Sequence, residues 1–581
     1  MCSIIGYYGD SKAAPIMISG LRRMEYRGYD SVGIATKVDD SMYIRKGVGR
    51  VDEVNKAEKL DELDGMIGLG HTRWATHGKV TRANAHPHAS NTSSVAIVHN
   101  GIIENFTELK TELEAEGFSF ESETDTEVIA NLLQKNYDST PEDAMIRTLG
   151  MIRGHYSFVA MFADGTLAAA RYHEPLIVGI NADSYHIASD VLGFVDNTDD
   201  AVYVENGHFL TIDKKGMHMY DFTGKPAEIK VTKISKEIAD VAKGEFTHYT
   251  LKEITEQPKT VLLASLENVE KAAKTITNAG SVYITGSGTS YNASLVAQYM
   301  MSRYARVNAI PIVSSEFSYS PVNIDSDSVL IAISQSGESA DVIAAVNDAK
   351  KLGAYIISIL NAPESTLARE SDMAINIKCG REIGVAATKS FTSQLVIIYS
   401  IVNSMCDGKL GFDANTVSSA ISDMLKDGEK LAELATKFKD VADIYVLGRG
   451  IHYPMAMEAA LKLKELSYIH AEGIAGGELK HGPLALIDNN VYAIVINPSD
   501  STYKDTLTSA REIKARGAHI IGVSDISSKV YDTWVKIPKS SDHVYPITEI
   551  VPIQLLAYYS ALVRGADPDY PRNLAKSVTV R

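Results

Sequence analysis

The chain has 581 residues, a formal net charge of −16 and a hydrophobic fraction of 45%. This length predicts several domains, since one domain holds about 100–200 residues, and the composition is that of a soluble globular protein. An acidic chain without a basic run excludes nucleic acid as the main partner. No uninterrupted apolar stretch approaches the ~20 residues that cross a membrane, and no signal peptide is visible. The three cysteines, Cys2, Cys379 and Cys406, are too few for a disulfide framework and indicate a reducing, cytoplasmic compartment.

The first element is a short β-branched strand that begins with Cys2, directly after Met1. Removal of Met1 would give one residue both a thiol and a free α-amine. A thiolate is a strong nucleophile, and an α-amine, which titrates near pH ~8, can act as the base for its own side chain. Taken alone, Cys2 is more simply interpreted as a small buried hydrophobic residue. The rest of the chain must decide between this role and that of a nucleophile.

Strands are predicted over residues 2–8 and 31–37, with a helix over 14–24 between them. Another apolar strand, at 66–69, runs into the polar and basic residues 70–78, which include Arg73 and Trp74. Clustered Arg, Thr and His residues after a strand are typical of a loop that binds an anion. The alternative is a solvated turn in which Trp74 packs on the core.

A strand at 95–98 is predicted to end at His99-Asn100-Gly101. The Asn100 amide and the Gly101 N–H offer two donors for an oxyanion, although Asn-Gly is also a favoured hairpin turn. Residues 124–127 fit a capping box for a helix over 127–134. Asp125 either complements the dipole of that helix or binds a substrate ammonium group.

Histidines are frequent in this region and raise the question of a metal. They are His71, His77, His86, His88 and His99. Their spacing does not match a structural zinc site and no cysteine lies near them, so no metal is predicted.

In this order, the segments resemble the class II glutamine amidotransferase family. The matching segments are Cys2 and residues 22–31, 70–78, 99–101 and 124–127. The resemblance implies an α+β N-terminal-nucleophile fold, an αββα sandwich. It also implies that Cys2 attacks the side-chain amide of glutamine with its own α-amine as base, while Asn100 and Gly101 hold the oxyanion.

The same resemblance implies which side chains bind glutamine. Arg73 would pair with the α-carboxylate and Asp125 with the α-ammonium group, while Trp74 would help to close the site. The implied glutamine-binding set is Arg73, Trp74, Thr76, His77 and Asp125. One departure is Ser3, where the family usually has glycine.

Strand-like segments continue to about residue 222, for instance at 208–212 and 216–220. The residues that follow are rich in Lys, Glu and Asp, which is typical of a domain connection. We therefore predict an amidotransferase domain over 2–222 and a linker over 223–250.

The rest of the chain contains an internal duplication. Three pairs of apolar segments match, 281–288 with 443–450 and 329–333 with 491–495 at an offset of 162 residues (443 − 281), and 353–357 with 517–521 at an offset of 164. Apolar strands that alternate with helices predict parallel, helix-covered sheets, and two copies predict two α/β subdomains. The predicted extents are 251–410 and 430–565, followed by a tail over 566–581.

The first copy carries polar loops after two of its strands, at 286–290 and 334–339. A dinucleotide fingerprint fails, because Tyr291 stands where a third glycine is needed. Hydroxyls and backbone N–H groups at helix starts instead predict a phosphate cradle, with simple helix capping as the alternative.

The second copy carries Glu458, Lys462 and Glu465 on one face of a helix predicted over 455–468. Such spacing usually means an exposed salt-bridge stripe. Most other positions of this helix are apolar, which favours a buried helix that lines a site. A glycine-rich loop with His481 follows it.

These segments resemble the paired sugar-isomerase (SIS) domains of the glutamine–fructose-6-phosphate aminotransferase family. The matching segments are residues 334–338, 380–386, 460–465, 478–485 and 571–580. With the N-terminal match, the resemblance covers nearly the whole chain. It implies that L-glutamine and fructose 6-phosphate are converted to glutamate and glucosamine 6-phosphate, in amino-sugar synthesis, by a homodimer without cofactor or metal.

The resemblance also implies roles in the sugar half of the reaction. His481 would open the sugar ring, Lys576 would form a Schiff base at C2, and Glu465 would move a proton between C1 and C2, supported by Glu458 and Lys462. The implied sugar-phosphate-binding set is Thr289, Ser290, Ser334, Gln335, Ser336, Ser339, Val385 and Ala575. Departures are Ser287, where many members have Cys, and Arg581, where Glu is common.

Two alternatives remain open. One is a paralogous enzyme that acts on another phosphosugar or amine acceptor. The other is a sugar-phosphate sensor that binds without turnover, but it would have no chemical use for the complete set of Glu458, Lys462, Glu465, His481 and Lys576.

Overall fold

The computed structural model describes residues 2–75, 78–234, 243, 245–264, 266–320 and 322–578. Predictions about Met1, Thr76, His77 and Arg581 therefore lie outside the described residues. The chain divides into two compact units, residues 1–241 together with 575–581, and residues 242–574. Each unit is described by itself.

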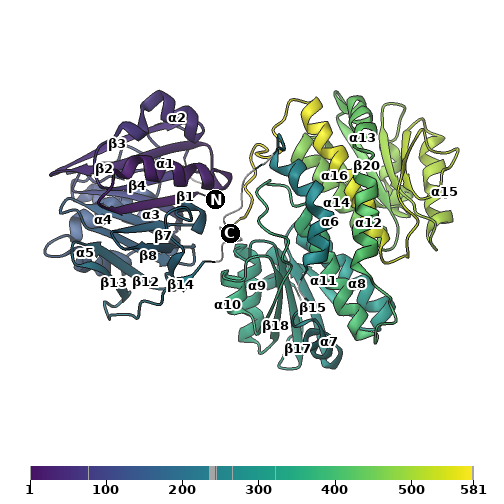
Figure 1. Ribbon diagram of the computed structural model, residues 1–581, viewed down its shortest axis with the longest axis horizontal. Coiled ribbons are helices and arrows are strands. Elements are labelled where there is room, and N and C mark those ends of the chain that lie inside the picture. Colours follow the sequence, from purple (N-terminus) through teal and green to yellow (C-terminus); the bar gives the residue numbers. More distant parts are fainter. Residues whose placement is uncertain are drawn as a thin grey trace. The chain divides into compact units, whose positions relative to one another are not determined.

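The first unit is an αββα sandwich (Figure 1). Its two sheets run β14-β11-β9-β10-β1-β4-β2-β3 and β13-β12-β8-β7-β6-β5, with antiparallel pairing throughout. The strands are β1 Ser3–Gly9, β2 Ser31–Val38, β3 Ser41–Val48, β4 Ile67–Arg73, β5 His88–Ala89, β6 Val95–Ile103, β7 Gly154–Phe162, β8 Leu167–Tyr172, β9 Ile177–Asn181, β10 Ser184–Ala188, β11 Asp200–Tyr203, β12 His208–Asp213, β13 Gly216–Asp221 and β14 Thr232–Lys233.

One apolar core joins the facing sheets of this unit, as Ile4 and Leu69 pack with Val98 and Val159. Helix α1 (Ala13–Met24) covers β1 and β4 from outside. A second core lies between the other sheet and three helices, α3 (Phe106–Ala115), α4 (Thr126–Asn136) and α5 (Pro141–Leu149). Helix α2 spans Val51–Glu58. The predicted αββα sandwich is confirmed.

The second unit holds two parallel five-stranded sheets, in the orders β16-β15-β17-β18-β19 and β21-β20-β22-β23-β24. The strands are β15 Ser281–Gly286, β16 Ala309–Val313, β17 Ser328–Ser334, β18 Tyr355–Leu360, β19 Met373–Asn376, β20 Asp443–Gly448, β21 His470–Ala475, β22 Tyr492–Ile496, β23 His519–Ser524 and β24 Thr533–Lys536. The helices are α6 Tyr249–Leu263, α7 Val269–Asn278, α8 Thr289–Met300, α9 Ala340–Lys351, α10 Thr366–Glu370, α11 Lys389–Met405, α12 Ala414–Leu425, α13 Gly428–Ala435, α14 His452–Ser467, α15 Tyr503–Lys514 and α16 Tyr545–Val563.

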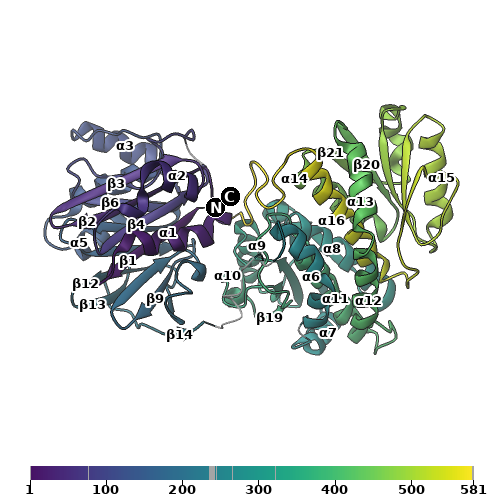
Figure 2. The same ribbon diagram turned by 45° about the horizontal axis from the view of Figure 1, so that its top comes forward.

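Helices α8, α11, α14 and α16 lie between the two sheets of this unit (Figures 1 and 2). They share one continuous apolar core with strands of both copies, which includes Ile284 of β15 and Val446 of β20. The predicted pair of α/β parallel-sheet subdomains is confirmed.

The strand register refines the internal duplication. Val282 of β15 pairs with Val329, and Ile444 of β20 pairs with Tyr492. Since Ile444 is the counterpart of Val282, Tyr492 is the counterpart of Val329, at an offset of 163 residues (492 − 329). The offset of 162 predicted for this strand is wrong by one residue, because a continuously apolar, fully buried strand carries no pattern that reveals a slip of one position.

Helix α16 is the one helix in the described part of the chain that is long and apolar enough, by length and composition, to cross a membrane. Within the protein, 83% of its apolar window is buried. It packs against α14 and α13, and Glu549 near its start is also fully buried. A central core helix of a globular domain passes the same test of length and composition.

Candidate active site

Cys2 lies at the start of β1, which pairs with β4 and β10. The Trp74 N–H donates to the Cys2 Sγ over 3.1 Å. Burial raises the pKa of the Cys2 thiol, and the Trp74 N–H and the Arg73 charge oppose this only in part. The thiol is therefore protonated at neutral pH, and it needs a base before it can act as a nucleophile.

Ser3, the departure from the family pattern, fits the structure without strain. Its side chain is fully buried, and its Oγ donates to the Met24 carbonyl over 2.8 Å, at the end of α1. The hydroxyl points to the helix that covers β1 and makes no hydrogen bond to Cys2. Ser3 thus anchors the strand that presents the nucleophile.

We expect Ser3→Gly to lower the free energy of unfolding by about 1–2 kcal/mol, because it removes a buried hydrogen bond and adds a glycine to a strand. The kcat for glutamine hydrolysis should stay within about twofold, since one structural hydrogen bond is not part of the transition state. Urea unfolding and a glutamate-release assay measure the two effects. A change in kcat above tenfold would mean that Ser3 takes part in the chemistry.

Arg73 is the last residue of β4, a strand predicted to end at residue 69. Residues 70–73 were predicted as loop, but they continue the ladder with β1 and β2, so that prediction is wrong. Sequence patterns missed this because the strand ends in polar residues that are nevertheless buried. The Arg73 guanidinium donates to the carbonyls of Lys79 (3.2 Å) and Gly78 (3.5 Å). A buried and oriented guanidinium suits a carboxylate ligand.

Trp74 follows Arg73 and is half-buried. Its ring meets the Tyr29 ring edge to face, with centroids 5.5 Å apart. The next residue, Ala75, donates its N–H to the Asp30 carboxylate over 2.9 Å. Together these contacts hold the segment that supplies the N–H donor to the Cys2 Sγ.

Asn100 and Gly101 lie inside β6, where they pair with Ser157 and Tyr156 of β7. The hairpin-turn alternative is therefore excluded, and the strand runs five residues beyond its predicted end at residue 98, to Ile103. The Asn100 Nδ2 donates to the Cys2 carbonyl over 3.2 Å, so the amide lies beside the predicted nucleophile.

Gly101 has a φ of +110°, and a Cβ at this position would lie 2.0 Å from the His155 carbonyl oxygen. Only glycine fits this backbone.

Asp125 precedes the first residue of α4, but it does not cap that helix with its side chain. Its Oδ2 accepts from the Ile103 N–H over 2.8 Å and so ties the start of α4 to the end of β6. The predicted capping box does not form, because Glu127 accepts instead from the Glu121 N–H (2.9 Å) and the Ser122 N–H (2.8 Å). Hydrogen bonds to the segment just before the helix thus replace the expected capping bond.

Four of the five histidines considered for a metal are buried: His71, His86, His88 and His99. Burial lowers the pKa of His71 to about 3 and holds those of His86 and His88 well below their usual value. Among the residues the structure describes, no group of three His, Cys, Asp or Glu side chains is arranged to hold a metal ion. The His77 candidate lies outside the described residues.

The two polar loops of the first SIS copy follow β15 and β17, which are adjacent parallel strands. Their carboxyl ends therefore meet at one edge of the sheet. Thr289 is the first residue of α8, and Ser290 behind it is buried and accepts from the Gln394 amide over 3.2 Å.

The second of these loops is shaped by its own hydroxyls. Ser334 Oγ accepts from the Gly337 N–H (3.1 Å), and Ser336 Oγ accepts from the Glu338 N–H (3.2 Å). Gln335 and Ser336 are half-buried, and Ser339 precedes α9 without a side-chain capping bond. The geometry is that of a compact loop at a helix start, where phosphate groups commonly bind.

The charged stripe of α14 is buried, so the exposed salt-bridge alternative is excluded. Glu458 and Lys462 are fully buried, whereas the Glu465 side chain keeps 20% of its surface exposed. The Lys462 Nζ lies 3.4 Å from Glu458 and 2.5 Å from Glu465. Burial opposes the charge of Lys462, but the two carboxylates raise its pKa to about 12.

The two SIS copies meet at this stripe. Glu458 accepts from Thr289 Oγ1 (3.0 Å) and from Asn292 Nδ2 (2.7 Å), both on α8. Lys462 in turn donates to Thr289 Oγ1 over 3.1 Å. The structure therefore brings the first phosphate-type loop directly against the carboxylates of the second copy.

Asn292 was missed by sequence reasoning. The only hint in the sequence is an amide side chain three residues after Thr289, on a helix that is otherwise built mostly of small and apolar residues. It is buried, and its donor satisfies one oxygen of a carboxylate that has no access to water.

We expect Asn292→Ala to raise the pKa of Glu458 further and to slow the sugar half of the reaction by about tenfold, because it removes a hydrogen bond of 1–3 kcal/mol from a buried carboxylate. Glutamine hydrolysis should be unchanged. The checks are separate assays of glutamate and amino-sugar release, with Asn278→Ala, at the exposed end of α7, as the matched control. Equal loss in both variants would contradict this role.

The remaining predicted residues of the sugar half lie in three other segments of the chain. His481 is exposed at the end of a 3-10 helix, Glu478–His481. The Val385 N–H donates to the Asp569 carbonyl over 3.2 Å. Ala575 and Lys576 are half-buried and belong to the first unit, whereas Glu458 belongs to the second. Their roles stay predictions.

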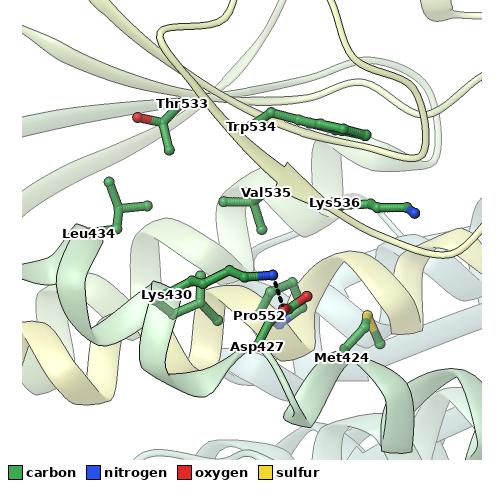
Figure 3. Close-up of a pocket in the computed structure, with 10 residues that line it drawn as sticks. Met424, Asp427, Lys430, Leu434, Thr533, Trp534, Val535, Lys536 and Pro552 are labelled. Atoms are coloured by element: carbon green, nitrogen blue, oxygen red, sulfur yellow. Dashed lines mark hydrogen bonds and ion pairs between the residues drawn. The ribbon is translucent and has the colours of Figure 1, made fainter.

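A cavity of about 90 Å³ lies elsewhere, beside β24 (Figure 3). Trp534 and Lys536 face Met424 and the ion pair of Lys430 with Asp427 across it. None of the predicted catalytic or ligand-binding residues lines this cavity.

Family comparisons agree with this arrangement of the molecule. Residues 71–195 match the glutamine amidotransferase domain, and residues 275–404 and 437–564 match the SIS domain. The fold and the two sites thus define a glutamine amidotransferase joined to a pair of SIS domains.

Relatives that match this chain over their full length identify the family within this class. The chain is 44% identical to the glutamine–fructose-6-phosphate aminotransferase (isomerizing) of Pyrococcus horikoshii and 41% identical to that of Methanothermobacter thermautotrophicus, over the whole of each chain. It belongs to the glutamine–fructose-6-phosphate aminotransferase (isomerizing) family. A solved structure, the C-terminal domain of glucosamine-fructose-6-phosphate aminotransferase from Francisella tularensis, is similar to 57% of this chain over its full length, with 34% identity and a TM-score of 0.53.

Proposed function

We propose that this chain converts L-glutamine and fructose 6-phosphate into glutamate and glucosamine 6-phosphate. The observation that carries the proposal is that one chain, related to these enzymes over its full length, holds both a half-buried thiol beside an amide donor and a buried carboxylate stripe beside a phosphate-type loop. The first arrangement suits amide hydrolysis, and the second suits chemistry on a sugar phosphate.

In the first half-reaction, the α-amine of Cys2, once Met1 has been removed, takes the proton of the thiol. The sulfur then attacks the amide carbon of glutamine, and the resulting oxyanion accepts hydrogen bonds from Asn100 Nδ2 and the Gly101 N–H. The tetrahedral intermediate then collapses: the C–N bond breaks, and the α-ammonium group of Cys2 returns its proton to the leaving nitrogen, so ammonia leaves. Water hydrolyses the thioester, which releases glutamate and restores the thiol. Arg73 and Asp125 hold the α-carboxylate and α-ammonium groups, Trp74 helps to close the site, and Thr76 and His77 complete the glutamine-binding set.

In the second half-reaction, the phosphate binds at the loops after β15 and β17, through Thr289, Ser290, Ser334, Gln335, Ser336 and Ser339. Val385 and Ala575 line the sugar site, His481 opens the ring and Lys576 forms a Schiff base with the C2 carbonyl. The ammonia made at Cys2 then replaces the lysine at C2.

Glu465 moves the proton between C1 and C2 that turns the ketose into an aldose. Its partial exposure supports this choice over Glu458, which is fully buried. Lys462 bridges the two carboxylates and keeps a cation in the site. No metal or cofactor enters the proposed mechanism.

The direct test mixes the purified chain with L-glutamine and fructose 6-phosphate and measures both products. We expect glutamate and glucosamine 6-phosphate in equal amounts. Faster turnover of another phosphosugar than of fructose 6-phosphate would support a paralogous enzyme. A ligand-dependent rise in Tm without product would support a sugar-phosphate sensor.

We further propose a cytoplasmic homodimer. The family resemblance supports the dimer, and three free cysteines support a reducing compartment. Light scattering after gel filtration measures the subunit count.

A further inference from the structure

We propose that His71 is a positioning residue for glutamine hydrolysis, whose ring N–H fixes the orientation of the Asn100 side-chain amide. This proposal rests on the proposed function, because it concerns the oxyanion donor of that reaction. His71 does not touch the substrate in this account. It acts through Asn100.

The hydrogen bonds around the His71 ring define which nitrogen carries the proton. Nε2 lies 3.0 Å from the Asn100 Oδ1 and 3.0 Å from the His99 carbonyl oxygen. The other end of the Asn100 amide donates to the Cys2 carbonyl, which can only accept, so its Oδ1 must face His71. Both neighbours of Nε2 are therefore acceptors, and Nε2 is the donor.

The surroundings hold the ring in this state. His71 is buried on β4, opposite Ile4 of β1 and Gly33 of β2. It stacks on the His86 ring at 4.2 Å between centroids, and its Nδ1 is buried without a hydrogen-bond partner in the described structure. Because burial lowers the pKa of His71 to about 3, the ring is neutral near pH 7 and carries a single proton, on Nε2.

The orientation matters because an asparagine amide has a donor end and an acceptor end. With the donor end toward Cys2, the amide can stabilise the oxyanion that forms on the glutamine carbon. If the amide flipped, its Oδ1 would face that oxyanion and repel it. His71 blocks the flip, because a flipped amide would present its NH₂ group to the Nε2–H.

The test compares His71→Phe, which keeps an aromatic ring but no donor, with His71→Gln, whose amide can restore one. The His71→Phe variant should have a kcat for glutamine hydrolysis about 10–100-fold below that of the wild type. This decrease should not exceed the one caused by removal of the oxyanion donor itself, and KM should stay within about threefold. The His71→Gln variant should keep most of the wild-type kcat. His88→Phe, in the same buried cluster but bonded to Thr124, is the matched control and should keep its activity.

Three further readouts separate positioning from a general structural role. Glutamate γ-semialdehyde, which forms a hemithioacetal with a thiol, should bind His71→Phe more weakly by the same factor as kcat, while alkylation of Cys2 by iodoacetamide stays unchanged. In an Asn100→Ala background, His71→Phe should cost nothing more in kcat, because the two residues act as one unit. His71→Leu, which also lacks a side-chain donor, takes the place of His71→Phe in the same comparisons if the phenylalanine variant does not fold.

The proposal is overturned if the wild-type chain hydrolyses glutamine and His71→Phe keeps its kcat, or if His71→Phe slows the Asn100→Ala enzyme as much as the wild type. A rise in KM with unchanged kcat also overturns it, since that would assign His71 to substrate binding. A wild-type chain that releases no glutamate at all overturns the proposed function instead.

Discussion

Replacement of Cys2 by alanine is expected to abolish glutamine-dependent synthesis of glucosamine 6-phosphate, with a fall in glutamate release of at least about 10⁴-fold. The thiol belongs to the residue whose carbonyl accepts from the Asn100 amide, and it accepts a hydrogen bond from the Trp74 N–H. Without it no thioester forms and no ammonia is made. The sugar half keeps its fold, so fructose 6-phosphate should still raise the Tm of the variant.

The matched control is Cys406→Ala, which removes a half-buried free thiol far from this site in the sequence and should leave both products unchanged. Intact-mass measurement of the same samples shows whether Met1 has been removed, which the proposed base requires. Glutamate release by Cys2→Ala at more than a few per cent of the wild-type rate would contradict the assignment of the nucleophile.

Replacement of His452 by leucine is expected to lower the free energy of unfolding by about 3–5 kcal/mol, because it leaves buried carboxylates without their cation. His452 stands in the second SIS copy where Ser290 stands in the first, at the offset of 162 residues (452 − 290). Its Nε2 lies 3.0 Å from Asp500, and its Nδ1 lies 2.7 Å from Glu549 on α16. All three side chains are essentially inaccessible to water.

The pH dependence of this effect has a defined sign. Burial opposes protonation of His452, but Glu549 and Asp500 raise its pKa to about 10. A raised pKa stabilises the fold fully below the unfolded value near 6.5, and the stabilisation is lost as pH rises from about 6.5 to 10, by about 1.4 kcal/mol per pH unit. The difference in stability between the wild type and His452→Leu should therefore shrink between pH 7 and pH 9.

Urea unfolding at several pH values measures this difference. His470→Leu is the control, because His470 is exposed, with its Nδ1 2.7 Å from the Asp443 carboxylate, and its loss should change stability by less than about 0.5 kcal/mol. A difference that stays constant or grows between pH 7 and pH 9 would contradict the charged state assigned to His452.

Local patterns predicted the elements of this chain better than their ends. Alternating and continuous apolar runs located β1, β2 and α14, and the duplication predicted the two parallel sheets. The ends of β4 and β6 were missed, because the polar residues that complete these strands gain burial only from neighbouring strands far along the chain. The predicted capping box failed for a more local reason, because Glu127 accepts from the N–H groups of Glu121 and Ser122 just before the helix.

Among the site residues, some could be predicted from the sequence and others could not. Cys2, Arg73 and Asn100 could be nominated from sequence, since their chemistry is specific and their order matches a known family. Asn292 and His71 could not, because each acts by holding another side chain, Glu458 or Asn100, across a contact between distant segments. Supporting residues of this kind leave no pattern along the chain.

In the proposed mechanism, one chain makes ammonia at Cys2 and uses it on the sugar. The most direct measurement supplies glutamine labelled with ¹⁵N in its amide, together with fructose 6-phosphate and an excess of unlabelled ammonium, and analyses the product by mass spectrometry. We expect glucosamine 6-phosphate that carries ¹⁵N and forms in step with glutamate. Unlabelled product, or glutamate without amino sugar, would contradict it.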